Sequence, residues 1–484
     1  MSSINSRNMC IVFFVGIIVY SGILLSGTDL WDGVIISHAF DTKQYFIYHN
    51  WFTESGWPLV PYMYDLFIFS GNEKLFIYSV LFVIIIFHIF SSLEIIRLTQ
   101  LVFKFNGNDS LLGGILFLIS PGWALYYSSV FLMHSMTIFI ALHCVRRMLE
   151  GKNIVLYSLL SFISFQQSSN PILIFSILII NAIISREITL SKLKFEISYI
   201  LSAIVFFLIS RELFKSSGLY VDYNKISISN LLDFSQYANY FKYFLHTNSF
   251  LIIFFIILCS YAKDKKLLIS GGVLLGGLIL NAIPYVSVGK VPLYYEINNS
   301  DGYSLRFSFT GVFLFSFLFS VFLNKIENAK IKFICAFIIL GQALYLNFAV
   351  QQSKLKSMIY QQEFIKSLEE LDYLPECTII LNEEGVGFHP AFYELNYIFN
   401  KAYGDTLRLP LSSGMLEPNS LANFKKLFVN PIYRAKYILP EKYPDCMVKL
   451  NINSKINSMA PFDVFLWYIN YGNSRGGLVS IEQP

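Results

Sequence analysis

The first long loop of the chain, residues 29–74, is rich in carboxylates, histidines and tryptophans. Asp32 lies beside Trp31 at the exit of a predicted membrane span, where the loss of water strengthens a carboxylate as a base. Asp41 and Asp29 belong to the same loop and could take the same role. The loop therefore predicts proton abstraction from a hydroxyl group at a membrane surface. For any one of these acids the alternative is a helix cap, which needs only a short polar side chain.

The same loop supplies residues that could hold a polar substrate. Read as one helix, residues 34–48 place polar side chains such as His38 and Asp41 on one face and apolar side chains such as Phe40 on the other. This pattern predicts an amphipathic helix along the membrane surface, with its polar face toward a cavity at the level of the lipid headgroups. The candidate substrate-binding residues of the loop are His38, Tyr45, Trp51, Glu54 and Trp57.

A later loop, residues 287–306, adds candidate phosphate ligands. Arg306 lies at the start of a predicted span, where a lipid phosphate would lie, and its planar fork suits phosphate because it donates two hydrogen bonds. Lys290 could add a point charge. For both residues the alternative is that the side chain only reaches the membrane interface. The candidate substrate-binding residues of this loop are Lys290, Tyr295, Glu296, Asp301 and Arg306.

The composition predicts that a lipid bilayer surrounds most of the chain. Of its 484 residues, 55% are hydrophobic and only 14% are charged, against about 25% charged residues in globular proteins. A soluble protein of this length could not bury so much apolar surface. The net charge of +4 is small and scattered, so nucleic acid is not an expected partner. The sequence has no HExxH, CxxC or P-loop motif, so zinc and nucleotide chemistry have no support.

Apolar runs of membrane-spanning length fill residues 1–350 and are absent from residues 351–484. We therefore predict a multi-span α-helical membrane domain over 1–350, containing the first loop 29–74, and a C-terminal domain over 351–484. About eleven transmembrane helices are expected, with a range of nine to eleven, because several runs are shorter than a full span. The predicted spans are 9–28, 75–95, 109–128, 130–145, 154–169, 171–186, 197–214, 248–262, 267–286, 307–324 and 331–350.

Lysine and arginine in the short loops predict the orientation, since cytoplasmic loops carry an excess of both. One set of alternating loops carries more of them than the other, over fewer residues. Its members are Arg7, Arg97, Lys104, Arg146, Arg147, Lys152, Arg186, Lys192, Lys194, Lys263, Lys265, Lys266, Lys325, Lys330 and Lys332. The N-terminus is therefore expected in the cytoplasm. An odd number of spans then puts the first loop and the C-terminal domain on the outer face.

The C-terminal residues read as a small α/β domain with short strands between helices. Its expected elements are a helix at 351–370, strands at 377–381, 437–439 and 447–451, and helical or loop segments between the strands, including 420–428. Cys377 and Cys446 are the only cysteines outside the predicted spans, and each just precedes an expected strand. In an oxidising compartment they could form a disulfide, and two free thiols are the alternative.

With these features the chain resembles the GT-C class of membrane glycosyltransferases. Within that class it looks like the bacteriophage-type serotype-converting O-antigen glucosyltransferases, the Gtr group. The resemblance rests on the length, an inside N-terminus with an outer C-terminal domain, the acidic and aromatic first loop, and Gly-Trp-Pro-Leu at 56–59, which is similar to the group's Gly-Arg-Pro-Leu. Trp57 stands where the group has arginine, and the group's paired acids correspond to the more widely spaced Asp29 and Asp32.

The resemblance implies a periplasmic reaction at a bacterial inner membrane. A sugar, glucose in the Gtr group, would move with inversion from undecaprenyl phosphate to an O-antigen repeat unit of lipopolysaccharide. The implied partners are this lipid-linked donor, the O-antigen acceptor, the lipid bilayer, a donor synthase and a flippase. Phosphate is already a good leaving group, so no cofactor and no metal are expected.

Other functions remain open. An O-antigen polymerase or ligase also has many spans and large outer loops, but its large loop usually lies between late spans. A polysaccharide or lipid transporter would be expected to show inverted repeats and charges deep within spans. The spans here carry few charged residues away from their ends. A non-enzymatic membrane anchor would leave the loop acids and aromatic residues without a role.

Overall fold

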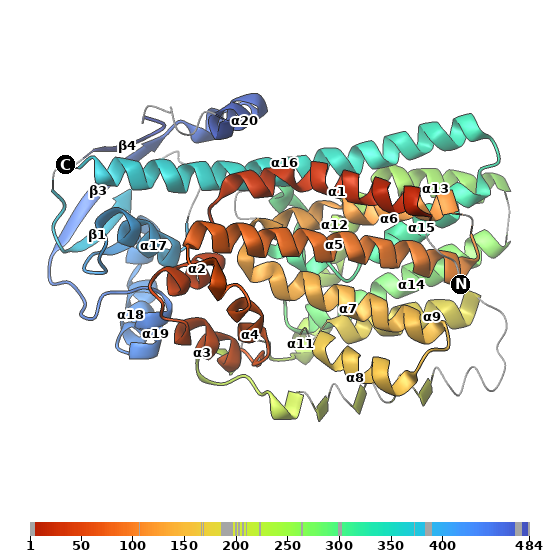
Figure 1. Cartoon of the computed structure of the whole chain (residues 1–484), viewed down its shortest axis with the longest axis horizontal. Coiled ribbons are helices and arrows are strands. Elements are labelled where there is room, and N and C mark those ends of the chain that lie inside the picture. The colour runs from red at the N-terminus through yellow and green to blue at the C-terminus, as the bar shows by residue number, and fades with distance from the viewer. Residues whose placement is uncertain are drawn as a thin grey trace.

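Long apolar runs form a bundle of helices, and the residues after the bundle form a smaller α/β domain at one end of it (Figure 1). The computed structural model describes residues 5–482. The residues that it does not describe within this range are 106, 166, 168, 185–196, 199–200, 202–203, 206–207, 210, 222–223, 263–264, 299–302, 372, 383–389 and 470–476.

The bundle contains five long helices and several shorter ones. The long helices are α1 (Ser6–Ser26), α5 (Glu73–Phe103), α7 (Leu132–Leu149), α14 (Lys265–Ser287) and α16 (Ala329–Glu369). The shorter helices are α6 (Gly107–Leu118), α8 (Ile154–Ser164), α9 (Asn170–Ile184), α12 (Phe234–Thr247), α13 (Ser249–Ala262) and α15 (Val312–Lys325). Asparagines cap the start of α5, α8 and α16, because the side chains of Asn72, Asn153 and Asn328 accept backbone N–H groups of the first turn.

The helices agree with a protein that crosses a membrane several times. Among the described residues, five helices are long and apolar enough to span, or up to seven if each of two bent pairs counts as one span. The bent pairs are α6 with η2 (Pro121–Tyr127) and α12 with α13. Every predicted span that the structure describes coincides with a helix of the bundle. The predicted span 197–214 lies largely outside the described residues, and the count of about eleven stays a prediction.

Polar side chains hold the bend between α6 and η2. Pro121 begins η2 and cannot donate a backbone hydrogen bond. The Tyr20 hydroxyl donates to the Leu118 carbonyl at 2.6 Å, and the Asn347 amide donates to the Ser120 carbonyl at 3.1 Å. No water in a bilayer core could satisfy these two carbonyls, so the side chains of α1 and α16 make the bend possible.

The C-terminal domain is built on one four-stranded sheet in the order β2-β1-β3-β4. The strands are β1 (Thr378–Asn382), β2 (Leu409–Ser412), β3 (Met447–Ser454) and β4 (Val479–Glu482), and only β3 and β4 pair antiparallel. Around the sheet lie α17 (Phe392–Tyr403), η7 (Ser413–Leu416), α18 (Pro418–Phe428), α19 (Pro431–Lys436), η8 (Ile456–Ser458) and α20 (Pro461–Ile469). Successive residues of β1 belong to two different hydrophobic clusters. Ile379 belongs to the cluster that contains Phe364 of α16, and Ile380 to the cluster that contains Leu409 of β2.

Most elements expected in this domain are present. The strands at 377–381 and 447–451 correspond to β1 and β3, and the helix at 351–370 to the second half of α16. The segment at 420–428, for which a helix or a loop was expected, belongs to helix α18. The prediction of a strand at 437–439 was wrong, because the chain turns after α19 and Ile438 has a φ of 60°. Cys377 and Cys446 form a disulfide, with their Cα atoms 4.9 Å apart at the start of two paired strands.

The first loop folds between the bundle and the C-terminal domain (Figure 1). It forms α2 (Gly33–Asp41), α3 (Phe46–Glu54), α4 (Val60–Asp65) and η1 (Ile68–Ser70). The prediction of one amphipathic surface helix over residues 34–48 was therefore wrong. Lys43 breaks it with a φ of 58°, and every residue of α2 from Gly33 to Phe40 is buried. The helix contacts both α5 and α17, so the bundle and the C-terminal domain cover it.

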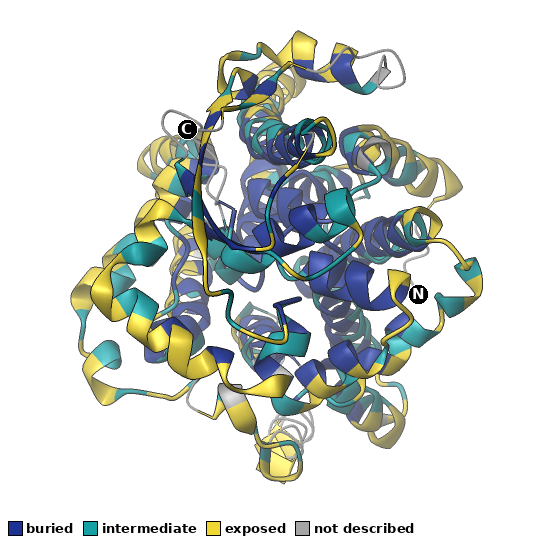
Figure 2. Cartoon of the chain, turned by 90° about the vertical axis from the view of Figure 1, so that its left-hand side faces the viewer, coloured by how far each residue is buried: buried dark blue, intermediate teal, exposed yellow. Residues whose placement is uncertain are grey.

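The described parts of the other long loops form short elements. These are η3 (Ser129–Phe131), η4 (Gly218–Tyr220), α11 (Ile228–Leu231), η5 (Tyr294–Asn298) and η6 (Tyr303–Ser308). The N-terminus lies at the end of the bundle opposite the C-terminal domain (Figure 1). Seen from the end that carries this domain, buried residues fill the centre and exposed residues form the rim (Figure 2).

Candidate functional site

Asp32 and Arg306 are far apart in sequence, but both contact the side chain of Tyr303. Asp32 precedes α2, is half-buried, and makes no side-chain cap hydrogen bond, so capping does not account for it. The Tyr303 hydroxyl of η6 donates to Asp32 Oδ2 at 3.2 Å. The guanidinium carbon of Arg306 lies 3.4 Å from the centroid of the same tyrosine ring. A carboxylate and a cation are thus held one tyrosine ring apart.

Trp31 fixes the position of Asp32. Its φ of 51° is uncommon for a bulky residue and is expected to be strained. Its ring packs edge-on against Tyr303 and Phe131, with centroids 5.4 Å and 6.2 Å away. Lys354 of α16 is fully buried and places its ammonium 4.5 Å from the centroid of the tryptophan ring. The corner formed by residues 31 and 32 is therefore held from the bundle side by aromatic packing and a second cation.

Glu394 of α17 holds the same corner from the C-terminal domain. One oxygen accepts the Trp31 backbone N–H at 2.9 Å, and the other accepts the Ala391 N–H at 2.8 Å. The side chain is buried, and this burial raises the pKa of Glu394 to about 7. The two backbone donors favour the ionised form and oppose the shift, while the charge of Asp32 adds to it. The carboxylate therefore titrates near neutral pH at the contact between the two domains.

This shift predicts a pH-dependent stability. The folded protein retains a proton on Glu394 that the unfolded chain releases, so its contribution is full below the ordinary pKa of 4.5 and is lost as pH rises to about 7. The loss is on the order of 3 kcal/mol. Unfolding of the wild type and of Glu394→Gln, followed from pH 4 to 8, should give a stability difference that declines over this window. A constant difference would mean that Glu394 is not the titrating group.

Lys436 of α19 brings a third cation to the first loop. Its ammonium donates to the hydroxyls of Tyr220 and Tyr437 and lies 4.9 Å from the centroid of the Trp51 ring. Burial lowers the pKa of Lys436 to about 7, although the charges of Asp32 and Glu54 favour its protonated form. Trp51 and Glu54, two candidates from the sequence, therefore lie beside a cation that the sequence did not reveal.

Lys290 and Arg306 share one region, as their positions in the later loop predict. Lys290 donates a hydrogen bond to the Asn224 side chain at 2.9 Å. Burial, and after it the positive charge of Arg306, lowers the pKa of Lys290 to about 8. Two cations that disfavour each other's charge would be stabilised by an anion bound between them. Lys290 and Arg306 are therefore candidates to bind one phosphate together.

The three candidate bases have different surroundings. Asp29 is fully buried and accepts hydrogen bonds from the backbone of Leu30 and Ser129 and from the Ser37 hydroxyl, each at 2.9 Å. Burial raises the pKa of Asp29, and these hydrogen bonds oppose the shift. Its contacts join the first loop to η3, which is a structural role. Asp32 retains a partly exposed carboxylate.

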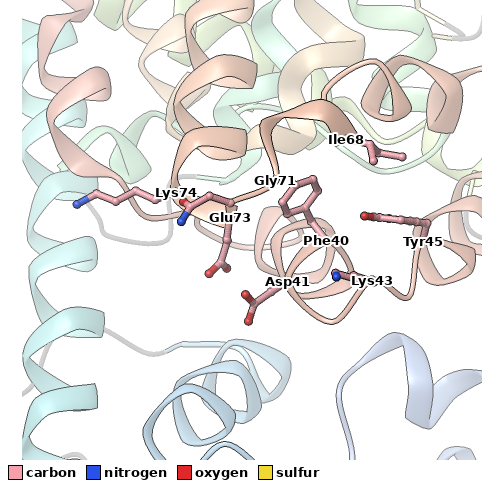
Figure 3. Close-up of a pocket in the computed structure, with 9 residues that line it drawn as sticks. Phe40, Asp41, Lys43, Tyr45, Ile68, Gly71, Glu73 and Lys74 are labelled. Carbon is pink, nitrogen blue, oxygen red and sulfur yellow. The ribbon is translucent and has the colours of Figure 1, made fainter.

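Asp41 lies at the other end of α2 and is paired with the C-terminal domain. Lys401 of α17 donates to Asp41 and to Glu73, both at 2.6 Å. Asp41, Glu73 and Tyr45 line one pocket, together with Lys43 (Figure 3). The pocket is therefore a second polar site, separate from the corner at Asp32.

The remaining candidates scatter over the two loops. His38 is buried, and its burial, followed by the charge of Lys401, lowers its pKa to about 4, so its imidazole is neutral at pH 7. Trp57 packs against Phe52. Glu296 accepts the Ser304 backbone N–H at 3.0 Å.

Two candidates of the later loop add little to the site. Tyr295 is 61% exposed and packs edge-on against Tyr294. Asp301 lies outside the described residues. No contact that the structure describes brings either of these two residues to Asp32.

The sequence reasoning missed four residues around Asp32. These are Tyr303, Lys354, Glu394 and Lys436. Tyr303 is close in sequence to Arg306, and its hydroxyl was the one feature of the sequence that could have marked it as a residue of the site. The other three come from residues 351–484, which the sequence analysis treated as a domain without chemistry.

Comparison with known proteins gives little further information. No family model and no curated protein matches the chain. Among solved structures, ArnT from Cupriavidus metallidurans bound to undecaprenyl phosphate has a TM-score of 0.42 at 10% identity. The apo state of the same protein has a TM-score of 0.40 at 9% identity. Both alignments cover 98% of this chain and 97% of the other. At these scores the similarity supports no conclusion about activity.

Proposed function

We propose that this protein is an inverting membrane glycosyltransferase of the GT-C class, which moves a sugar from a polyprenyl phosphate to an acceptor hydroxyl. One observation carries the proposal. Tyr303 holds the carboxylate of Asp32 by its hydroxyl and the guanidinium of Arg306 by its ring. A base and a phosphate-binding cation one side chain apart are what transfer from a sugar phosphate needs.

The reaction follows from these two groups. Asp32 accepts the proton of the acceptor hydroxyl while the hydroxyl oxygen attacks the anomeric carbon of the donor. The bond between that carbon and the phosphate oxygen breaks on the opposite face, so the configuration inverts. The phosphate leaves with the bonding pair, and Arg306 stabilises the negative charge that develops on it. No metal is required in this scheme.

Three further cations support the phosphate site. Lys290 shares the region of Arg306 and is partly desolvated, so an anion gains more from it than from a lysine in water. Lys354 and Lys436 surround the corner at Asp32. These cations would add to the positive potential around a lipid phosphate bound near Asp32.

The finer part of the proposal names the substrates. The donor is undecaprenyl-phosphate glucose, made inside and flipped outward, and the acceptor is an O-antigen repeat unit, as in the Gtr group. The protein would act at the periplasmic face of a bacterial inner membrane and depend on a donor synthase and a flippase. The disulfide between Cys377 and Cys446 supports an oxidising compartment for the C-terminal domain.

The orientation gives a prediction of its own. Since cytoplasmic loops carry the excess of lysine and arginine, the C-terminal domain should lie in the periplasm. Alkaline phosphatase fused after Pro484 should be active, and green fluorescent protein at the same place should be dark. The same pair fused after Lys152, in a loop of the opposite set, should give the reverse pattern. An active phosphatase at Lys152 with a silent one at Pro484 would invert the topology and remove the site from the outer face.

Mass analysis of lipopolysaccharide tests the substrates. Cells with the gene should carry one additional hexose per O-antigen repeat relative to cells without it. Cells with the Asp32→Asn variant should look like the cells without the gene. A changed number of repeats with an unchanged repeat mass would instead support a polymerase, and an unmodified product at normal protein levels would reject the O-antigen acceptor.

A further inference from the structure

The pocket beside Asp41 has the size and the polar groups of a ligand site. Its cavity is about 430 Å³, within the range of roughly 300–1,000 Å³ that small-molecule sites occupy. Residues of α2, η1 and the start of α5 line it, with Asp41, Lys43, Tyr45, Ile68 and Glu73 among them (Figure 3). We propose that this pocket binds a neutral, hydroxyl-rich saccharide.

The acceptor groups of the pocket are fixed in place. Lys401 holds Asp41 and Glu73 at 2.6 Å each, and the Tyr397 hydroxyl donates to Glu73 at 2.7 Å. A carboxylate offers about four acceptor positions, so each of these two keeps some for a ligand. The Asp41 side chain is 46% exposed and the Glu73 side chain 16%. Both carboxylates are therefore pre-oriented and reachable.

Donor groups face the same opening. The Lys43 ammonium and the Tyr45 hydroxyl point toward the space beside Asp41, whereas Lys74 points away from the other lining residues (Figure 3). Sugar hydroxyls donate and accept hydrogen bonds at once, so a mixture of fixed acceptors and donors suits vicinal hydroxyls. The half-buried ring of Tyr45 offers an apolar face for the C–H groups of a sugar ring.

The charges of the pocket favour a neutral ligand. The residues that line the pocket include two carboxylates, Asp41 and Glu73, and two ammonium groups, Lys43 and Lys74, so the lining carries no net charge. An anionic sugar would meet two carboxylates, and a cationic sugar would meet two ammonium groups. A neutral sugar can hydrogen-bond to Asp41, Glu73 and Lys43 without such a conflict.

The pocket is separate from the proposed reacting centre. Asp32 and Asp41 lie nine positions apart along α2, which corresponds to about 13 Å at 1.5 Å per residue. A saccharide in the pocket therefore does not carry the attacking hydroxyl at Asp32 on the same sugar ring. If the protein has the proposed function, the bound saccharide is a more distant part of the acceptor. Its identity as acceptor rests on the proposed function, whereas saccharide binding to the pocket does not.

Binding to the full-length protein in lipid nanodiscs tests the inference. The probe is the neutral oligosaccharide fraction released by mild acid from the surface polysaccharide of the source cells, with the acidic fraction measured beside it. The neutral fraction should bind, and the acidic fraction should bind at least tenfold more weakly. Ile68→Trp fills the cavity without touching a charged group and should weaken binding of the neutral fraction at least tenfold.

The matched control is Leu66→Trp, which adds the same side chain in the same loop at a residue that is 70% exposed. This variant should bind within twofold of the wild type. Asp32→Asn should lose sugar transfer and keep the affinity, which separates a failed saccharide site from a failed transferase. The inference is overturned if neither fraction binds, if only the acidic fraction binds, or if Ile68→Trp binds like the wild type.

Discussion

Replacing Asp32 with asparagine should lower kcat for sugar transfer by about 10²–10⁴-fold, which is the usual contribution of a general base. Asparagine has nearly the same shape, and its oxygen can still accept the hydrogen bond from Tyr303. It cannot take the proton of the acceptor hydroxyl. The KM for the donor should change much less, because the phosphate site at Arg306 is intact. Initial rates of the purified variant over a range of donor concentrations give both constants.

Two variants make this result specific. Asp445→Asn makes the same chemical change at an exposed acid of the C-terminal domain and should keep the wild-type rate. Asp41→Asn tests the second candidate base, and its effect should fall on the KM for the acceptor rather than on kcat. If Asp32→Asn is folded and transfers sugar at the wild-type rate while Asp41→Asn loses kcat, the base lies in the pocket at the other end of α2.

Replacing Arg306 with alanine should reduce kcat/KM for the lipid-linked donor by roughly 10–100-fold. A hydrogen bond to a charged group contributes about 1.5–3 kcal/mol, and each 1.4 kcal/mol is a factor of ten. If Arg306 contacts the phosphate equally in the ground state and the transition state, the change appears mainly in KM. Steady-state kinetics with the donor varied at a fixed acceptor concentration measures the division between the two constants.

The controls separate charge from packing. Arg306→Lys keeps the charge and loses the planar fork that lies over Tyr303, so its effect should be intermediate. Lys215→Ala removes an exposed cation that pairs with Glu212 and should leave the donor KM unchanged. A loss of kcat alone in Arg306→Ala, with the donor KM of the wild type, would show that Arg306 acts on the charge that develops in the transition state rather than in binding the donor. An unchanged kcat/KM would contradict a role for Arg306 at the phosphate.

Local patterns in the sequence predicted the elements that depend on local physics. Long apolar runs predicted the helices of the bundle, because such runs have one stable solution in a bilayer. Short runs between expected helices predicted β1 and β3, and the two cysteines at their starts predicted a disulfide that the structure contains. The helix at 34–48 failed because its apolar and polar residues fit a surface helix, whereas contacts with α5 and α17 decide where α2 lies.

The site was predictable only in part. Asp32 and Arg306 could be selected because acids and arginines at the ends of spans are few. They are connected through Tyr303, whose hydrogen bond to Asp32 joins residues 271 positions apart, and no local pattern reveals it. The same holds for Glu394, which accepts a hydrogen bond from Trp31 over 363 positions. The first contact depends on how two distant loops pack, and the second on how the C-terminal domain docks. No local spacing in a single sequence reveals either arrangement.

The most direct test of the transferase is a reaction with purified components. The full-length protein in nanodiscs is given undecaprenyl-phosphate glucose, labelled in the sugar, and isolated O-antigen repeat units. We expect the label to move to the acceptor with inverted anomeric configuration and one undecaprenyl phosphate to be released per sugar transferred. An unconsumed donor in the presence of folded protein and acceptor, or transfer with retained configuration, would contradict a single displacement assisted by Asp32.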